Sequence, residues 1–283
     1  MTTNQVDELV DADDDVKQAE IVVGTSGFSY GDWVGRVYPD DIKKEKMLSF
    51  YASDLGFRLV ELNDTYNTVP VTGWAENLLN DVTAGFAFVV KAHKSMTRNI
   101  YDRDGAYIRD EEAVEAFMAG VNPLVDANAL KCIIAQFPVR FARSDGAFAH
   151  IKWLAGSVAP VPLVVEFRNI NWMAKSAFDK LHEIGVGYCS VDGPELPEFP
   201  NFTPAGTAPV SCVRLCGRNK NWFDVKGSAR YDYNYSNFEL KQLTEPIRKI
   251  AETSADVIVL FNNYTNGASV KNAKILKELL PLG

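Results

Sequence analysis

Short apolar segments rich in β-branched residues recur along most of this chain, and helical segments separate them. Buried parallel strands have this composition, because helices cover both faces of a parallel sheet. Eight such segments occur, at residues 21–23, 58–62, 86–91, 131–135, 164–168, 187–191, 210–215 and 257–261. The alternation predicts a single parallel (β/α)8 TIM barrel spanning residues 21–283. A doubly wound open sheet is the alternative that the same pattern allows.

The segments between the strands carry apolar residues at helical spacing. Helices are expected at residues 43–55, around Trp74 and Leu78, and at 111–125, 147–154, 175–184 and 268–280. Two long connections, 93–110 and 219–236, are expected as loops, the first basic and the second rich in aromatic residues. In compact domains, ordered loops of this length usually serve function.

Composition narrows the class of protein. Residues 1–20 are acidic with little to bury, so they predict a solvated, disordered tail. The net charge of −8 argues against a protein that coats duplex nucleic acid. No apolar run is long enough to span a membrane and no signal peptide is recognisable, so we expect a cytoplasmic protein with no membrane partner. The cysteines, expected as mostly buried free thiols, are Cys132, Cys189, Cys212 and Cys216.

Polar and charged residues stand at the carboxyl ends of nearly all the expected strands, which is where TIM-barrel enzymes carry out their chemistry. Glu166 and Arg168, two positions apart on one strand, share a face. The candidate catalytic residues are Glu61, Lys91, Glu166 and Asp192. The candidate substrate-binding residues are Ser26, Asn63, Gln136, Arg168, Arg214, Arg218, Asn262 and Asn263.

The charged candidates are expected to converge in one pocket, because each has the inward parity of its own strand. They are Glu61, Lys91, Glu166, Arg168, Asp192 and Arg214, three carboxylates that balance three cations. Structural ion pairing is the alternative interpretation of each residue taken singly.

Three functions fit these residues. The first is an enzyme for a small anionic or polyhydroxylated substrate, whose phosphate or carboxylate the arginines and Lys91 bind while a carboxylate of raised pKa acts as acid or base. Hydrolysis, isomerisation and lyase chemistry all fit. The second is a barrel that binds nucleic acid or a phosphodiester, and the third is a binding barrel without catalysis.

No cofactor is expected. The three histidines, His93, His150 and His182, are too few for a multinuclear zinc site. A single Mg²⁺ or Mn²⁺ on Glu61, Glu166 or Asp192 is the alternative. The oligomeric state has no signal in the sequence.

Several short motifs occur in order from about Ile21 to the C-terminus. They are residues 24–30 with Trp33, 60–66 with Pro70, Lys91, Gln136 with Pro138, 166–168 with Trp172, Asp192, Arg214 with 217–218, and 261–263 with Ala268, Asn272 and Ala273. Together they resemble the YecE-like family, also called domain of unknown function 72, and the resemblance implies a TIM barrel. The sequence departs from the family pattern at Asn67, where an aromatic residue is common, and at Arg98, Asn169 and Cys216, where histidine is frequent.

Overall fold

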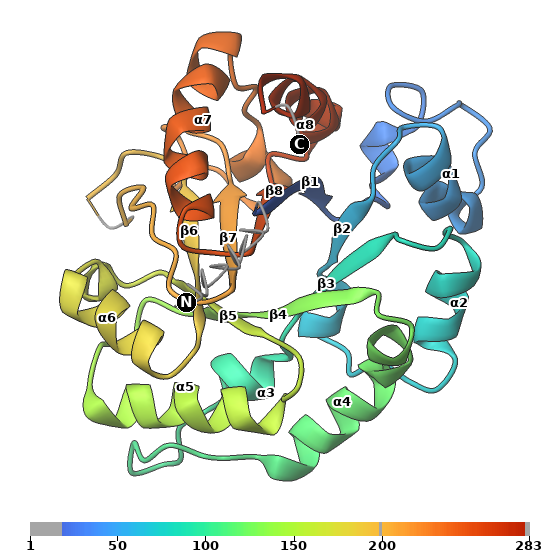
Figure 1. The fold of residues 1–283 in the computed structure, drawn as a ribbon. Coiled ribbons are helices and arrows are strands. Elements are labelled where there is room, and N and C mark those ends of the chain that lie inside the picture. The colour runs from blue at the N-terminus through green and yellow to red at the C-terminus, as the bar shows by residue number, and fades with distance from the viewer. Residues whose placement is uncertain (1–18, 198–199, 281–283) are drawn as a thin grey trace, which may run out of the picture.

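The chain folds into a closed barrel of eight parallel strands, which confirms the predicted TIM barrel over the open sheet (Figure 1). The computed structural model describes residues 19–197 and 200–280. The strands, each paired with the next and β8 with β1, are β1 (Glu20–Ser26), β2 (Leu59–Leu62), β3 (Ala87–Lys91), β4 (Leu130–Phe137), β5 (Leu163–Phe167), β6 (Gly187–Asp192), β7 (Val210–Leu215) and β8 (Asp256–Phe261). Residues 1–18 of the predicted tail lie outside the described residues, whereas Glu20 already belongs to β1.

Helices surround the barrel on its outer side (Figure 1). They are α1 (Met47–Ser53), α2 (Trp74–Asn80), α3 (Lys94–Thr97), α4 (Glu111–Asp126), α5 (Asp145–Ser157), α6 (Lys175–Glu183), α7 (Asn237–Ala251) and α8 (Ala268–Leu279). The expected helix at 43–55 is divided into the 3-10 turn η2 (Lys44–Lys46) and α1. The expected loop at 93–110 begins with α3, and the loop at 219–236 contains the 3-10 helix η5 (Gly227–Tyr231). Among the described residues, no helix lies between β6 and β7, and none is long and apolar enough to cross a membrane.

Residues of each strand alternate between two apolar layers. On β5, Val165 and Phe167 pack outward against the helices, whereas Val164 packs inside the barrel. The barrel interior is filled by small and medium side chains, among them the buried thiols of Cys132, Cys189, Cys212 and Cys216. All four cysteines are free, as predicted.

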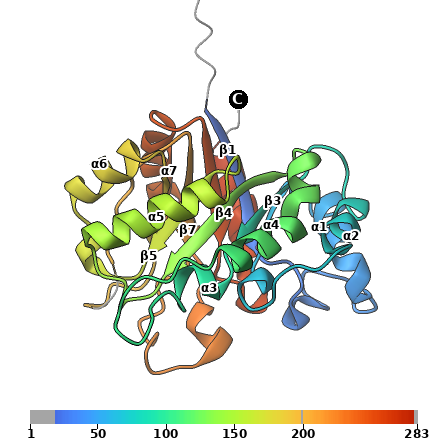
Figure 2. The ribbon, with the colours of Figure 1, turned by 90° about the horizontal axis from the view of Figure 1, so that it is seen from below.

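A stack of aromatic rings holds the carboxyl ends of β4 and β5. Phe137 stacks on Phe141 with ring centroids 4.0 Å apart, and Phe167 stacks on Trp172 at 3.9 Å. The indole of Trp172 also donates a 2.8 Å hydrogen bond to the carbonyl of Phe141. Because Phe137 and Phe167 face outward, their neighbours Gln136 and Glu166 face the barrel interior from a fixed backbone. In Figure 2, α3 and the orange segment that follows β7 lie at this same end of the barrel.

Gly24 of β1 permits a close approach between β1 and β2. A Cβ at this position would lie 2.3 Å from the carbonyl oxygen of Leu59. Gly24→Ala should therefore destabilise the fold by about 1–3 kcal/mol, the usual cost of overpacking a core. Chemical denaturation measures the loss. Gly156→Ala is the control, since Gly156 is an exposed helical residue with open space around its Cα, and alanine there should be neutral or slightly stabilising. Equal stability of the two variants would contradict the prediction.

Candidate functional site

Arg214 of β7 lies at the centre of the carboxyl end of the barrel. Its Nη1 donates to Oε2 of Glu61 at 2.5 Å and to Oγ of Ser26 at 2.8 Å, and Nη2 donates to Oε1 of Glu61 at 2.7 Å. Its Nε donates to Oε2 of Glu166 at 2.6 Å. All four side chains are buried. One guanidinium group therefore joins β1, β2, β5 and β7 by charge-assisted hydrogen bonds.

Glu166 also contacts a second arginine. Its Oε1 lies 2.7 Å from Nη2 of Arg168, which is 14% exposed at the end of β5. This contact is an ion pair without hydrogen-bond alignment, and Oε1 has no hydrogen bond within the described part of the chain. The structure thus contains the ion pairs that the alternative interpretation foresaw.

Both carboxylates are ionised at neutral pH. Burial would raise the pKa of Glu61, but Arg214 and Lys91 outweigh burial and lower it. Burial likewise opposes ionisation of Glu166, yet the charges of Arg168, Arg214 and Lys91 lower its pKa to about 2. The expectation of a carboxyl group with raised pKa is therefore wrong for these two residues, since neither holds a proton to donate.

Lys91, at the end of β3, has a different environment. Its Nζ lies 5.0 Å from the centroid of the Tyr66 ring and forms no salt bridge with any described carboxylate. Burial and the positive charge of Arg214 lower the pKa of Lys91, and they outweigh the carboxylates of Glu61 and Glu166. A lysine with a lowered pKa exchanges its proton more readily near neutral pH.

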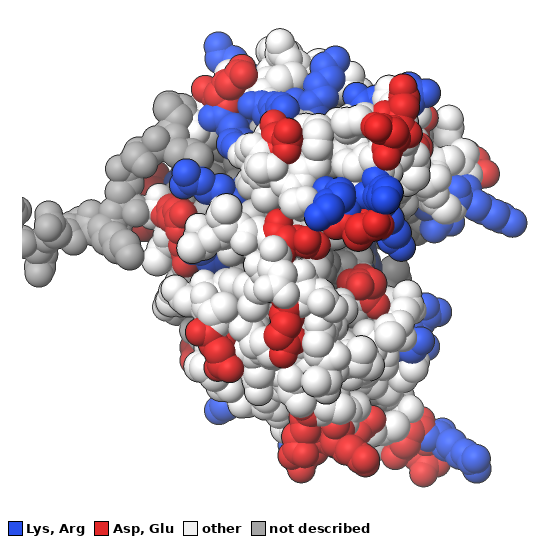
Figure 3. Space-filling model, turned by 90° about the vertical axis from the view of Figure 1, so that its right-hand side faces the viewer, with Lys and Arg blue, Asp and Glu red and all other residues white. Residues whose placement is uncertain are grey.

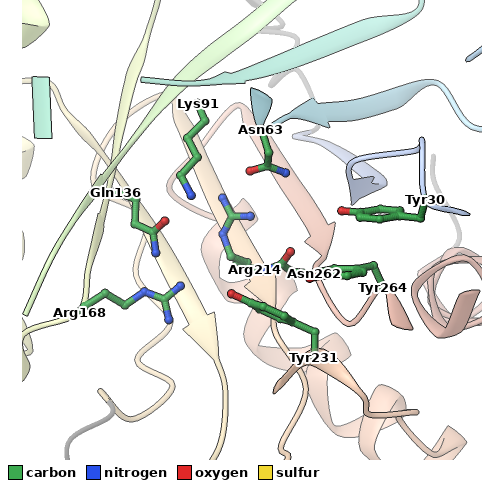
Figure 4. Close-up of a pocket in the computed structure, with 9 residues that line it drawn as sticks. All are labelled: Tyr30, Asn63, Lys91, Gln136, Arg168, Arg214, Tyr231, Asn262 and Tyr264. Carbon is green, nitrogen blue, oxygen red and sulfur yellow. The ribbon is translucent and has the colours of Figure 1, made fainter. Parts of the chain in front are cut away.

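A cavity of about 220 Å³ opens above this cluster (Figure 4). Figure 4 shows the side chains of Lys91, Gln136, Arg168 and Arg214 pointing toward one another across it. Its lining residues are Tyr30, Asn63, Lys91, Gln136, Arg168, Arg214, Tyr231, Asn262 and Tyr264. Nine sequence-derived candidates meet at this end of the barrel. Six of them line the cavity: Asn63, Lys91, Gln136, Arg168, Arg214 and Asn262. The other three, Ser26, Glu61 and Glu166, are buried and hold Arg214.

Three tyrosines that the candidate residues did not include form one wall of the cavity. Tyr30 and Tyr264 stack with ring centroids 4.3 Å apart, and Tyr231 stacks on Tyr264 at 5.1 Å. Tyr30 and Tyr231 lie in stretches where the sequence showed small or aromatic residues, but Tyr264 had no signal beyond following Asn262 and Asn263. These rings come from distant parts of the chain and are brought together by stacking, so the spacing of the tyrosines along the sequence does not reveal the wall.

The inward orientation predicted for Asp192 is wrong. On β6, Cys189 and Val191 pack inside the barrel while Tyr188 packs outward, so Asp192 has the outward parity. Its carboxylate accepts hydrogen bonds from Arg218 at 2.7 Å and from the hydroxyl of Tyr235 at 2.6 Å. Neither Asp192 nor Arg218 lines the cavity.

Asn263 is also turned away from the cavity, donating to the carbonyl of Tyr233 at 2.8 Å and to Oδ1 of Asn272 at 2.7 Å.

Because Asp192 lies outside the cavity, the charges around the cavity do not balance as predicted. Three cations, Lys91, Arg168 and Arg214, face two carboxylates, Glu61 and Glu166, which leaves one net positive charge.

The positions that depart from the family pattern have different surroundings. Cys216 is buried, accepts a hydrogen bond from Nδ2 of Asn262 at 3.8 Å and has its pKa raised to about 11, chiefly by burial. Asn169 donates to the carbonyl of Val139 at 2.6 Å. Asn67 is exposed. Arg98 lines a neighbouring cavity.

A divalent cation fits this donor set poorly. Both oxygens of Glu61 and one of Glu166 are hydrogen-bonded by Arg214, so a metal would have to displace a guanidinium group. Within residues 19–197 and 200–280, no group of three or more His, Cys, Asp or Glu side chains is placed to hold a metal ion.

The fold and site define a TIM barrel with a cationic, partly aromatic cavity at its carboxyl end. The chain belongs to the family described as protein of unknown function DUF72, whose model matches residues 22–282. It is 27% identical to the UPF0759 protein YunF of Bacillus subtilis over 93% of this chain and 95% of that protein.

Two solved structures of the family are similar to this chain. A DUF72 family protein from Thermotoga maritima is 36% identical with a TM-score of 0.84, over 92% of this chain and 99% of the other. A second, from Enterococcus faecalis, is 25% identical with a TM-score of 0.79, over 93% and 96% of the two chains. The barrel is thus the fold of the family.

The low pKa of Glu166 predicts a specific pH dependence of stability. A carboxyl group whose pKa is depressed by folding stabilises the fold above its unfolded pKa of about 4.3 and loses that contribution as pH falls toward its folded value. Glu166→Gln should therefore lower the free energy of unfolding by on the order of 3 kcal/mol at pH 6, and the difference from the unmodified protein should shrink steadily toward pH 3.

Urea denaturation at a series of pH values measures this difference. Glu183→Gln is the control, because Glu183 is an exposed helix residue that pairs with the exposed Lys180, and the effect of this substitution should be small at every pH. Linkage requires the effect of Glu166→Gln to shrink as the pH falls. An effect that is independent of pH between 3 and 6 would show that the arginines do not hold this carboxylate.

Proposed function

We propose that this protein is an enzyme that acts on a small anionic, polyhydroxylated substrate bound in the cavity at the carboxyl end of the barrel. The observation that carries the proposal is the charge of the cavity, where three cations face two carboxylates that are already paired. A phosphate or carboxylate group of the substrate would supply the missing negative charge.

The lining residues suit the remaining parts of such a substrate. Arg168 is the more exposed of the two arginines, so its guanidinium is the group that an incoming anion meets first. The amides of Asn63, Gln136 and Asn262 both donate and accept hydrogen bonds, as sugar hydroxyls require. The tyrosine wall offers ring surface for the apolar face of a sugar.

Lys91 is the residue to which we assign proton transfer. Its pKa is lowered and its ammonium group forms no salt bridge with a described carboxylate, whereas Glu61 and Glu166 are held ionised by arginine. Glu61 positions Arg214, and Glu166, through its contacts with Arg168 and Arg214, positions both arginines. We do not assign a catalytic role to Asp192, which binds Arg218 away from the cavity.

The free cysteines and the surface charge are consistent with this proposal. Four unpaired buried thiols favour work in a reducing compartment such as the cytoplasm. A binding surface for duplex nucleic acid is less well supported, because the net charge is −8 and the face shown in Figure 3 carries acidic and basic side chains side by side.

Arg168→Gln tests the proposal. Isothermal titration of the unmodified protein with orthophosphate and with sugar phosphates should show binding, and the variant should bind at least about tenfold more weakly, since one charge-assisted pair contributes about 1.5–3 kcal/mol. Arg103→Gln is the matched control, because Arg103 is an exposed loop residue outside the cavity, and its affinity should be unchanged. Failure of every phosphate and sugar acid to bind the unmodified protein would refute an anionic substrate.

A further inference from the structure

A second cavity, of about 380 Å³, adjoins the first. The two share the side chains of Lys91, Gln136 and Arg168 as a common wall. The second extends over the ends of β3 and β4, where Arg98 follows α3 and Arg140 follows β4. The cavities are therefore two compartments of one depression at the carboxyl end of the barrel.

The second compartment is lined by cations without a carboxylate. Its lining includes Lys91, Arg98, Arg140 and Arg168, together with aromatic and apolar side chains. Neither Arg98 nor Arg140 forms a salt bridge with any carboxylate among the described residues. By contrast, Arg168 and Arg214, which line the first compartment, are both paired with buried glutamates.

Arg140 is positioned rather than free in solvent. Its Nη2 donates a hydrogen bond to the carbonyl of Arg98, and its guanidinium carbon lies 5.8 Å from the centroid of the Tyr101 ring. This hydrogen bond ties the side chain of Arg140 to the backbone of Arg98, although the two residues come from different loops. Both side chains line the same compartment without a carboxylate partner among the described residues, so an anion bound there would interact favourably with both charges.

We infer that the second compartment binds a second anionic group, so that the substrate class is a small molecule with two phosphate or carboxylate groups, as in a sugar bisphosphate. One group would lie by Lys91 and Arg168 and the other between Arg98 and Arg140. This inference rests on the proposed function, because it extends the same site. The first anion and a hydroxyl bound to Gln136 would both lie at the shared wall, and the second anion would lie beyond it in the second compartment.

Alkane bisphosphonates of graded chain length, with methylphosphonate as the singly anionic comparator, test the inference without knowledge of the natural scaffold. Titrations are made at one ionic strength, because surface charges are screened by salt. One chain length should bind at least about tenfold more tightly than methylphosphonate, since the second group then binds at high effective concentration. The double variant Arg98→Gln/Arg140→Gln should lose this gain and keep its affinity for methylphosphonate.

The controls separate the possible outcomes. Arg103→Gln, in the same loop as Arg98 but outside both cavities, should bind every probe like the unmodified protein, and thermal midpoints verify that each variant is folded. If methylphosphonate binds but no bisphosphonate binds more tightly, the second anion site is refuted and the proposed function stands. If methylphosphonate does not bind at all, the proposed function fails as well. Tighter binding of a single-stranded oligonucleotide than of any bisphosphonate, lost in the double variant, would overturn the inference in favour of a phosphodiester groove.

Discussion

The ion pairs of Arg214 are the interaction on which the carboxyl end of this barrel depends. A buried guanidinium group is costly unless its donors are satisfied, and here Glu61, Glu166 and Ser26 satisfy them from three other strands. Removing Arg214 would leave two buried carboxylates without compensation, and removing either Glu61 or Glu166 would leave part of the buried charge of Arg214 without compensation. The polar layer is therefore a cooperative unit, and it closes the apolar barrel interior with charged groups that are already oriented toward the cavity.

Much of this arrangement follows from strand periodicity. The apolar segments predicted all eight strands, and the two-residue period correctly placed Glu166 and Arg168 on one face with Phe167 on the other. It failed for Asp192, because a strand buried on both faces gives no polar side from which to read the inward parity. Tyr188 and Ser190 on one face are no less compatible with the interior than Cys189 and Val191 on the other, and only closure of the barrel decides between them.

The rest of the site could not be predicted because it depends on contacts between distant loops. Tyr264 lines the cavity by stacking on Tyr30 from the opposite end of the chain, and Arg140 meets the carbonyl of Arg98 across separate loops. No local pattern encodes such pairings. The pKa directions were also beyond the sequence, since burial and neighbouring charges oppose each other and their balance is set by geometry.

The loops and the barrel differ in how freely their amino-acid sequence can vary. Gln136 faces the cavity while its neighbour Phe137 belongs to the aromatic stack, so a change of backbone at either position disturbs both layers. Arg98 and Arg140 are exposed and lie outside the strands, so their replacement leaves the core packing intact. Exchange of such loop residues can therefore change the ligands that the cavity accepts without disturbing the charged layer around Arg214.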